Sequence, residues 1–254
     1  MRRADTQAAY GAPSAMHTAR GGAVYVAPDT APEGAGIFFF TRLGGASKPP
    51  YDSLNVSKKV GDDPKAVDEN LSVIRSAMDL RPAAWVRQVA GDCVVRVSES
   101  GFAGEADALV TAETDLCLSV AVADCVPVAL VGEREVGIVH SGWRGTLSGV
   151  SGKAAHSLGG GRVQAYIGPS IRRCCYEVSA ELASEFAAEF GDEVVSGRHL
   201  SLQDAIRVDL ERAGVGVNDL GLCSGCLPDL FYSHRKQGPL TGRNLASVVI
   251  REAR

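Results

Sequence analysis

The chain has 254 residues, of which 45% are hydrophobic and 22% are charged, so it can bury a sizeable core. A formal net charge of -4 and a pI near 5.8 provide no basic face for nucleic acid, and no apolar run is long enough to span a membrane. Seven cysteines without an export signal predict a cytoplasmic protein with reduced thiols.

The chain is expected to consist of a flexible leader over residues 1–30 and one domain over residues 31–254. The leader has no continuous apolar stretch, and no repeat or linker divides the rest of the chain. Residues 37–41 predict a buried strand. Asp63 and Pro64 then suit the start of a helix, whose apolar stripe comprises Val67, Leu71, Ile74 and Met78.

The middle of the chain is dominated by apolar segments. Residues 83–90 and 93–97 are strand-like and predict a hairpin around Gly91 and Asp92. Residues 116–131 are too short for a membrane span and predict two buried strands, interrupted near Asp124. Another strand is expected over residues 135–140.

The C-terminal half alternates between helical and strand patterns. After the turn at Gly142, one helix is predicted with an apolar face of Leu147, Val150, Ala154 and Leu158. Strands are further expected over 163–168 and 243–250, and helices over 177–190 and 202–213. Because the βαβ cadence is irregular, we expect an α+β (mixed α/β) fold, a layered sandwich of mixed sheets covered by helices in a single domain.

Three residues carry the strongest chemical signal. Asp124 lies within an apolar segment, where an unpaired carboxylate is costly, and Cys125 follows it. His140 ends an apolar strand just before a glycine-rich turn. Taken singly, each residue is also explained as a structural core residue. Together with Arg144 they predict a catalytic centre.

Polar residues elsewhere suggest substrate contacts. Arg144 at a predicted helix start suits phosphate or carboxylate, or a surface salt bridge, and Trp143 suits a substrate ring or the core. Residues 42–47 predict a second anion cradle through Arg42 and Ser47, or a plain turn. Weaker polar candidates are Asn55, Arg235 and Arg243.

The Cys223-Ser-Gly-Cys226 segment is a CxxC motif. A zinc ribbon requires a second spaced pair, whereas Cys174 and Cys175 are adjacent. We therefore interpret these cysteines as buried or loop thiols rather than as a metal site.

Several motifs in fixed order together resemble one family, the YfiH-like laccase-domain proteins, described both as polyphenol oxidases and as purine nucleoside phosphorylases. They run from about residue 37 to the end of the chain. The most specific are Thr41-Arg-Leu-Gly-Gly-Ala-Ser47, Ala106-Asp-Ala-Leu-Val-Thr111, Ala123-Asp-Cys-Val-Pro127, His140-Ser-Gly-Trp-Arg-Gly145 and Thr241-Gly-Arg243.

The resemblance implies a zinc ion held by a histidine of a Gln-Val-His-Gly segment, by Cys125 and by His140. Here the segment reads Gln88-Val-Ala-Gly91, so Ala90 occupies the third ligand position. A naturally degenerate site and an engineered variant are both consistent with this replacement. Other donors that could substitute are Asp92, Cys93, His199 and His234.

The reaction implied by the resemblance is the cleavage of adenosine, inosine or guanosine by phosphate, with possible deamination of adenosine. Phosphate would contact Arg144, Arg42 and Ser47, and Asp124 would stabilise charge on the ribose. Zinc-bound water would attack the adenine ring for deamination. The sequence carries no indication of an oligomeric state.

Three alternatives remain open. The first is a hydrolase of amide bonds in cell-wall precursors, with Cys125 as nucleophile, His140 as base and Asp124 orienting it. The second is a copper polyphenol oxidase, which five histidines support poorly. The third is a non-catalytic nucleotide-binding module, for which Ala90 is the sequence support.

Overall fold

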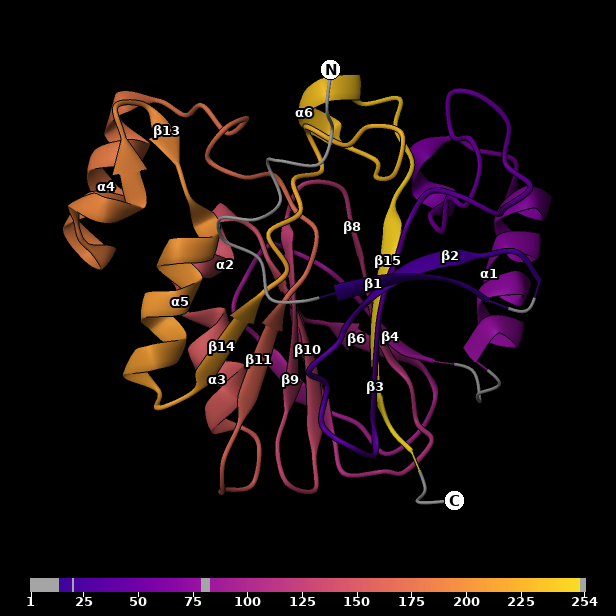
Figure 1. The fold of residues 1–254 in the computed structure, drawn as a ribbon, viewed down its shortest axis with the longest axis horizontal. Helices are drawn as coiled ribbons and strands as arrows, with labels where there is room; N and C mark the ends of the chain where they lie inside the picture. Colours follow the sequence, from indigo (N-terminus) through magenta and orange to yellow (C-terminus); the bar gives the residue numbers. More distant parts are fainter. Residues whose placement is uncertain (1–13, 20, 79–82, 252–254) are drawn as a thin grey trace.

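A computed structural model describes residues 14–19, 21–78 and 83–251 (Figure 1). One sheet has the order β1-β2-β3-β15-β8-β4-β6. Its strands are β1 (Ser14–Thr18), β2 (Val24–Pro28), β3 (Ala35–Phe40), β15 (Asn244–Ile250), β8 (Leu118–Val122), β4 (Ala84–Arg87) and β6 (Gly101–Glu105). The first five strands in this order, from β1 to β8, pair antiparallel with their neighbours. Strand β4 pairs in parallel with both β8 and β6.

A second sheet has the order β14-β11-β9-β10-β7-β5 and is also mixed. Its strands are β14 (Gly216–Asp219), β11 (Gln164–Ile167), β9 (Val126–Val131), β10 (Val136–Ser141), β7 (Ala108–Thr111) and β5 (Val94–Arg96). A short pair, β12 (Val195–Ser196) and β13 (His199–Leu200), stands apart.

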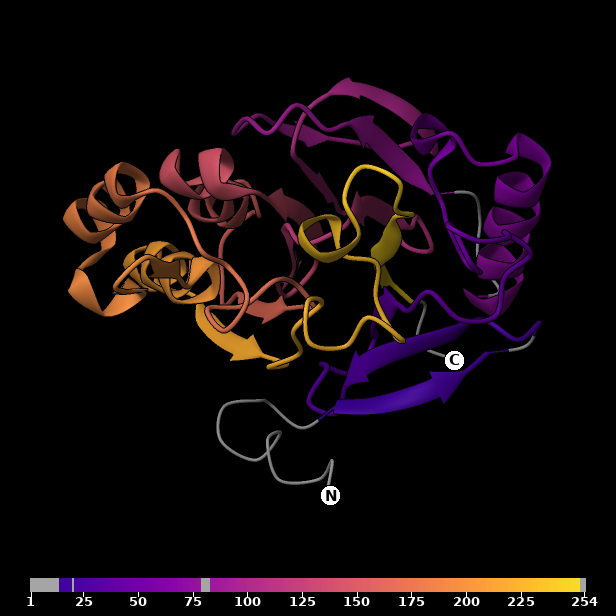
Figure 2. The same ribbon diagram turned by 90° about the horizontal axis from the view of Figure 1, so that it is seen from above.

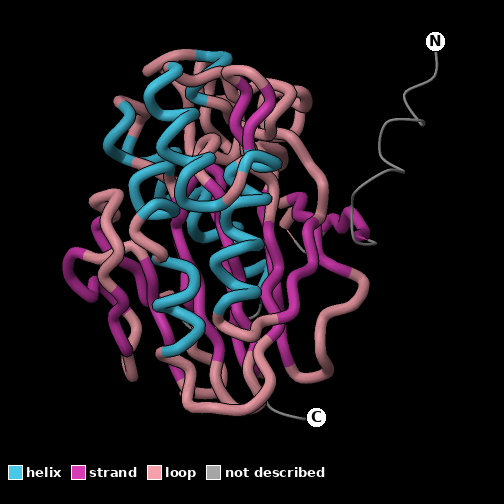
Figure 3. Tube along the Cα trace, turned by 90° about the vertical axis from the view of Figure 1, so that its left-hand side faces the viewer, coloured by secondary structure: helices cyan, strands magenta, loops and turns pink. Residues whose placement is uncertain are grey.

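Three apolar clusters stack the elements into layers. The central one joins side chains of both sheets, such as Phe39 of β3 and Ile138 of β10. The outer face of the first sheet packs on α1 (Pro64–Met78). Helices on the outer face of the second sheet (Figures 1 and 3) are α2 (Trp143–Leu147), α3 (Val150–His156), α4 (Ala180–Phe190) and α5 (Leu202–Arg212). The molecule is therefore an α/β/β/α sandwich.

Strand β3 illustrates how the sequence builds this layering. Its side chains alternate, so Ile37 and Phe39 enter the central cluster while Phe38 and Phe40 face α1. Since both faces are covered, an uninterrupted apolar run suits the strand. The predicted fold class and single domain are confirmed by this arrangement.

The remaining short elements are α6 (His234–Gln237) and the 3-10 turns Lys58–Val60 and Asp192–Val194. Figure 2 shows α6 lying above the ends of the two sheets. None of the described helices has the length and apolarity that a bilayer crossing requires.

The predicted hairpin of residues 83–97 is wrong. Strand β4 belongs to the first sheet and β5 to the second, so the segment between them crosses from one sheet to the other. The crossing is fixed by the Asp107 carboxylate, which accepts hydrogen bonds from three backbone N–H groups of residues 89–91. The hydrophobic periodicity of residues 83–97 cannot reveal such a contact, because Asp107 lies outside this segment.

The leader predicted over residues 1–30 is wrong for residues 14–30, which contain two paired strands, β1 and β2; residues 1–13 lie outside the described part. Tyr25 of β2 packs edge-on against Phe38, with ring centres 5.1 Å apart. The predicted helix after Gly142 is divided, because Gly149 adopts a φ of 69° between α2 and α3. In α1, Asn70 is buried and Leu71 is only half-buried.

Candidate functional site

The candidate site forms where β8 and β10 end and β9 begins. Residues 116–131 divide as predicted into β8 and β9, with Asp124 and Cys125 between them. Because β9 pairs with β10 in the register His140–Pro127, Cys125 comes next to the turn after β10. A Cβ atom added to Gly142 would lie 3.2 Å from the Cys125 sulfur, so glycine leaves the room that this thiol occupies.

Asp107, which immediately precedes β7, connects two parts of the site. Its fully buried carboxylate accepts backbone hydrogen bonds from Ala90 (3.0 Å) and Gly91 (2.7 Å) and a third from Val89 (3.2 Å). The Nδ1 atom of His140 lies 2.7 Å from the same oxygen that accepts from Ala90. Burial opposes ionisation, but these hydrogen bonds outweigh it and lower the pKa of Asp107.

His140 is oriented by this carboxylate. It is 8% exposed, and burial alone would lower its pKa. Negative charge on Cys125 and the hydrogen bond to Asp107 reverse this effect and raise the pKa to about 9. Nδ1–H donates to Asp107, and a pKa of about 9 means that Nε2 also carries a proton at neutral pH, which it must lose before it can bind a metal or act as a base.

A zinc ion of the kind implied by the resemblance needs three protein ligands. Cys125 and His140 adjoin as predicted, but Ala90 has no donor. In the described part of the chain, a single group of three or more potential ligands has donor atoms within 4.8 Å of one another, and neither Cys125 nor His140 belongs to it. The residues present therefore do not complete this zinc site.

The four substitute donors do not complete it either. Asp92 forms an ion pair with Lys153. Cys93, His199 and His234 are exposed, and none of them forms a three-donor group with Cys125 and His140 within the described ranges.

Asp124 lies beside this centre in a constrained conformation. Its φ of 84° is in the left-handed region, which aspartate tolerates better than most residues. Ser224 Oγ donates to Oδ1 (2.7 Å) and the Arg235 backbone N–H to Oδ2 (2.6 Å). Asp124 does not contact the His140 ring through either bond, so the orienting role assigned to it in the hydrolase alternative falls to Asp107.

A shallow cavity of about 600 Å³ adjoins Asp124 through Arg235, which lines the cavity and donates its backbone N–H to Asp124. Aromatic Trp143 and Tyr176 line it together with Arg235, whose guanidinium lies 5.0 Å from the centre of the Tyr176 ring. Burial, and then the charges of Cys125 and Asp124, raise the pKa of Tyr176 to about 12, against the opposing charge of Arg235. The phenol is therefore a hydrogen-bond donor at neutral pH.

Arg144 is exposed and adjoins this cavity through Trp143, which lines it. Its guanidinium stacks 4.2 Å from the centre of the Trp143 ring. Among the described residues it forms no ion pair with a carboxylate. The cation is thus held in place by an aromatic ring while its N–H groups remain available.

The other predicted binding residues belong to a separate hydrogen-bonded network. Arg42 donates to the carbonyl groups of Asp52 (2.7 Å) and Pro228 (2.9 Å). Ser47 and Asn55 both donate to the Asp62 carboxylate, at 2.6 and 2.8 Å. These contacts stabilise the loop before α1, and they use the polar atoms that a phosphate would need. Of the weaker candidates, Arg235 lines the cavity and Arg243 donates to neighbouring backbone carbonyls.

Sequence reasoning missed Asp107, Tyr176 and Ser224. Asp107 gives the same signal that singled out Asp124, a carboxylate within an apolar stretch. That signal could have found it. Tyr176 and Ser224 reach the site from loops distant in sequence, and neither has a local pattern that marks it.

The sandwich and its buried Asp107–His140–Cys125 centre define a laccase-like domain. The chain belongs to the family described as multi-copper polyphenol oxidoreductase laccase, which matches residues 36–251.

Relatives in this family carry a different description. The Deinococcus radiodurans "Purine nucleoside phosphorylase" is 38% identical over 83% of this chain and 87% of its own length. "Purine nucleoside phosphorylase YfiH" of Escherichia coli is 31% identical over 86% and 94%. Among solved structures, YlmD from Geobacillus stearothermophilus has a TM-score of 0.82 and 30% identity, covering 94% of this chain and 100% of its own.

The donor set argues against copper chemistry suggested by the family description. A blue-copper centre uses two histidines and a cysteine. Near Cys125 only His140 is present among the described histidines: His156 donates to the Gly152 carbonyl of its own helix, and His17 stacks on Tyr25. The remaining two are exposed, His199 in β13 and His234 at the start of α6.

Proposed function

We propose that this chain cleaves purine nucleosides with phosphate, and is thus a glycosyl-transferring enzyme. The observation that carries the proposal is the position of Asp124, a carboxylate fixed by Ser224 and Arg235 beside a cavity with aromatic and cationic walls. The names of the relatives, which are purine nucleoside phosphorylases, support the same substrate class.

In this reaction a phosphate oxygen forms a bond to C1′ of the ribose while the bond from C1′ to N9 of the purine breaks. The electron pair of that bond passes to the base, which takes up a proton. The products are ribose 1-phosphate and the free purine. Positive charge develops on the ribose in the transition state, and a fixed carboxylate such as Asp124 stabilises it. Each oxygen of Asp124 accepts one hydrogen bond, so lone pairs remain for substrate.

Arg144 and Arg235 are suited to hold the phosphate. Guanidinium groups bind phosphate oxygens through paired N–H donors, and both groups are positioned by aromatic rings, Trp143 and Tyr176. The same rings offer apolar faces to a purine. We assign no step to a metal ion, because Cys125 and His140 supply two of the three ligands that a catalytic zinc requires.

The test is the conversion of inosine, guanosine and adenosine with and without phosphate, followed by chromatography of free base and ribose 1-phosphate. We expect base release only with phosphate, and a loss of at least about 100-fold in Asp124→Asn, because a group that stabilises developing charge is worth about that much. Asp115→Asn is the matched control, since Asp115 also has a positive φ, 59°, at the opposite end of β8.

The proposal is wrong if no base is released with phosphate by either this chain or its Ala90→His form. Equal loss in Asp124→Asn and Asp115→Asn would assign Asp124 a structural role. With adenosine, formation of inosine tests the deaminase reaction separately.

One geometric observation favours a second candidate, a cysteine hydrolase. Asp107, His140 and Cys125 form a carboxylate–imidazole–thiol series, and the Asp107–His140 distance is 2.7 Å. A thiol-directed alkylating probe distinguishes the candidates. Rapid, selective labelling of Cys125 that abolishes amide hydrolysis, with zinc giving no protection, would favour the hydrolase over the phosphorylase.

A further inference from the structure

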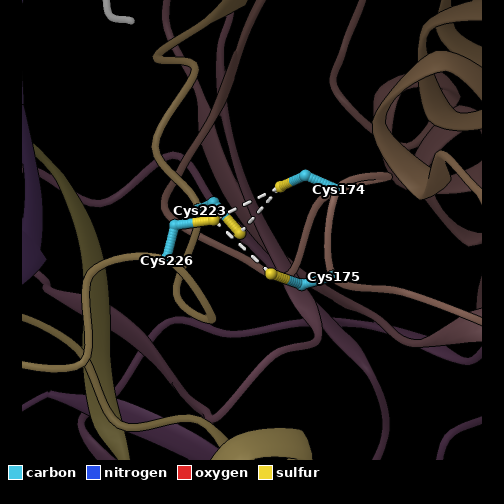
Figure 4. A group of neighbouring side chains, drawn as sticks. All are labelled: Cys174, Cys175, Cys223 and Cys226. Carbon is cyan, nitrogen blue, oxygen red and sulfur yellow. Dashed lines mark hydrogen bonds between the residues drawn. The ribbon is translucent and has the colours of Figure 1, made fainter.

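Four cysteines outside the candidate active site converge at one point (Figure 4). Cys174 Sγ lies 3.5 Å from Cys223 Sγ and 3.4 Å from Cys226 Sγ, and Cys175 Sγ lies 3.4 Å from Cys226 Sγ. All four sulfur atoms are within 4.8 Å of one another, and all four are free thiols. A tetrahedral zinc site with bonds of about 2.3 Å has sulfur–sulfur edges of about 3.8 Å, close to these separations.

The backbone, rather than the thiols, brings the two pairs together. A bridge joins Ser170 to Cys223, and the Ser224 N–H donates to the Ser170 carbonyl at 3.0 Å. On the other side, Arg172 forms a two-point ion pair with Asp219, at 2.8 and 2.7 Å, which fixes the turn that carries Cys174 and Cys175. Both turns are therefore held in place independently of any ligand.

Gly225 permits the close approach. A Cβ atom at this position would lie 2.9 Å from Cys175 Cβ and 3.0 Å from its sulfur. Cys226 N–H also donates back to the Cys223 carbonyl, which curls the CxxC segment around its centre. In the sequence, the adjacency of Cys174 and Cys175 argues against a metal site. In the structure, their turn directs both sulfur atoms toward the CxxC segment, so adjacent cysteines can still contribute two ligands.

The chemistry of the group suits a thiophilic cation. Cys223 is buried and Cys175 is half-buried. Cys174 and Cys226 are exposed, which provides an entry path for an ion. Sulfur donors in tetrahedral array favour zinc or iron, and zinc is the usual ion of closed four-cysteine sites.

We propose that Cys174, Cys175, Cys223 and Cys226 bind one structural zinc ion. On binding, four sulfur–zinc bonds form and the thiol protons pass to solvent, with no change of oxidation state. The site shares no residue with the Cys125–His140 centre. It lies beside the candidate active site, because Tyr176, which lines the cavity, directly follows Cys175, and Ser224, which donates to Asp124, lies within the CxxC segment.

The first test uses the unmodified chain. Zinc and iron are measured by plasma emission, and the accessible thiols are titrated with a thiol reagent before and after a strong chelator. We expect one zinc per chain, with Cys174 and Cys226 unreactive until the chelator is added. Exposed Cys93 is the internal control and should react in both states. Immediate reaction of Cys174 and Cys226 in the native protein would overturn the proposal, as would iron in place of zinc.

The second test separates this site from the Cys125 centre. Cys125→Ser should keep the zinc, whereas Cys174→Ser and Cys226→Ser should lose it; Cys117→Ser, which alters a buried thiol elsewhere, should keep it. After cobalt replaces zinc, the charge-transfer and visible bands of a tetrahedral thiolate complex should persist in Cys125→Ser and vanish in Cys226→Ser. Metal lost in Cys125→Ser but kept in Cys226→Ser, or a mass lower by two hydrogens from a disulfide, would refute the assignment.

Discussion

Replacement of Asp107 by asparagine is the most informative perturbation of the buried centre. The carboxylate accepts four hydrogen bonds, two on each oxygen: Oδ1 from Ala90 N–H and His140 Nδ1–H, and Oδ2 from Val89 and Gly91 N–H. An amide accepts on one side only. With its oxygen toward His140, the Val89 and Gly91 donors face an NH2 group. In the other orientation, Ala90 loses its acceptor and His140 must lose its Nδ1 proton, which leaves a neutral ring protonated at Nε2 alone.

The loss of stability in Asp107→Asn depends on how many hydrogen-bond donors are left without an acceptor. Each buried donor without a partner costs about 1–3 kcal/mol. Since the three backbone donors are only partly buried, we take the lower values and expect Asp107→Asn to lower the free energy of unfolding by about 2 kcal/mol or more. Loss of the carboxylate should also lower the pKa of His140, because the hydrogen bond to Asp107 and its negative charge help to raise that pKa.

Urea unfolding monitored by fluorescence measures the stability change, and nitrogen-resolved NMR of the His140 ring measures the tautomer. Asp92→Asn is the matched control, because the Asp92 side chain is 43% exposed and its ion pair with Lys153 lies on the surface; it should cost less than about 1 kcal/mol. If the two variants lose the same small amount of stability, Asp107 does not organise the site and the role assigned to its hydrogen bonds is wrong.

Three further predictions address the phosphate, the third ligand position and pH. Arg144→Ala should raise the KM for phosphate about 10-fold or more, since a charged hydrogen bond contributes about 1.5–3 kcal/mol, while leaving nucleoside binding nearly unchanged; equal effects on both in steady-state kinetics would make Arg144 structural. Ala90→His should increase zinc bound in a Cys226→Ser background, measured by plasma emission, because it adds the missing donor at a φ of 57°, which histidine tolerates; unchanged zinc would contradict it. Glu135→Gln should lower stability by about 0.5–1 kcal/mol near neutral pH. Hydrogen bonding to Arg96 lowers the pKa of Glu135, so this stabilisation is present above the unfolded-state pKa and is lost as pH falls through the folded-state pKa; a deficit that persists in acid by urea unfolding would refute it.

Local patterns predicted those parts of the fold that depend on local physics. The break at Asp124 between β8 and β9 was visible because a charged residue interrupts an apolar run, and Pro64 marked the start of α1. The pairing of strands into sheets was not visible. Residues 83–97 look like a hairpin, yet β4 and β5 belong to different sheets because Asp107 binds the connecting segment.

The same distinction separates the site residues. Cys125 and His140 were predictable because each lies at the end of a buried strand, and the strand register brings them together. Arg42, Ser47 and Asn55 looked equally polar in the sequence, but their partners Asp52 and Asp62 engage them in the loop before α1. A polar side chain becomes a binding residue only when no neighbour uses its donors, and neighbours are set by the fold.

The cysteine arrangement shows the opposite case, in which sequence spacing argued against a site that the fold assembles. Cys174 and Cys175 have the wrong spacing for a zinc ribbon. Sequence spacing predicts a metal site only when a single local turn must present both ligands of a pair. Here the Arg172–Asp219 ion pair and the Ser170–Cys223 bridge position two turns from distant parts of the chain.

The position of Ala90 shows why a missing ligand need not disturb the fold. The backbone N–H of Ala90 and the ring of His140 share one oxygen of Asp107, so the segment is held by its main chain and not by a side chain at position 90. A metal at Cys125 and His140 would add to this arrangement without creating it. The scaffold of the centre therefore survives exchange of the residue at position 90, and the chemistry of the centre can change while the sandwich around it stays the same.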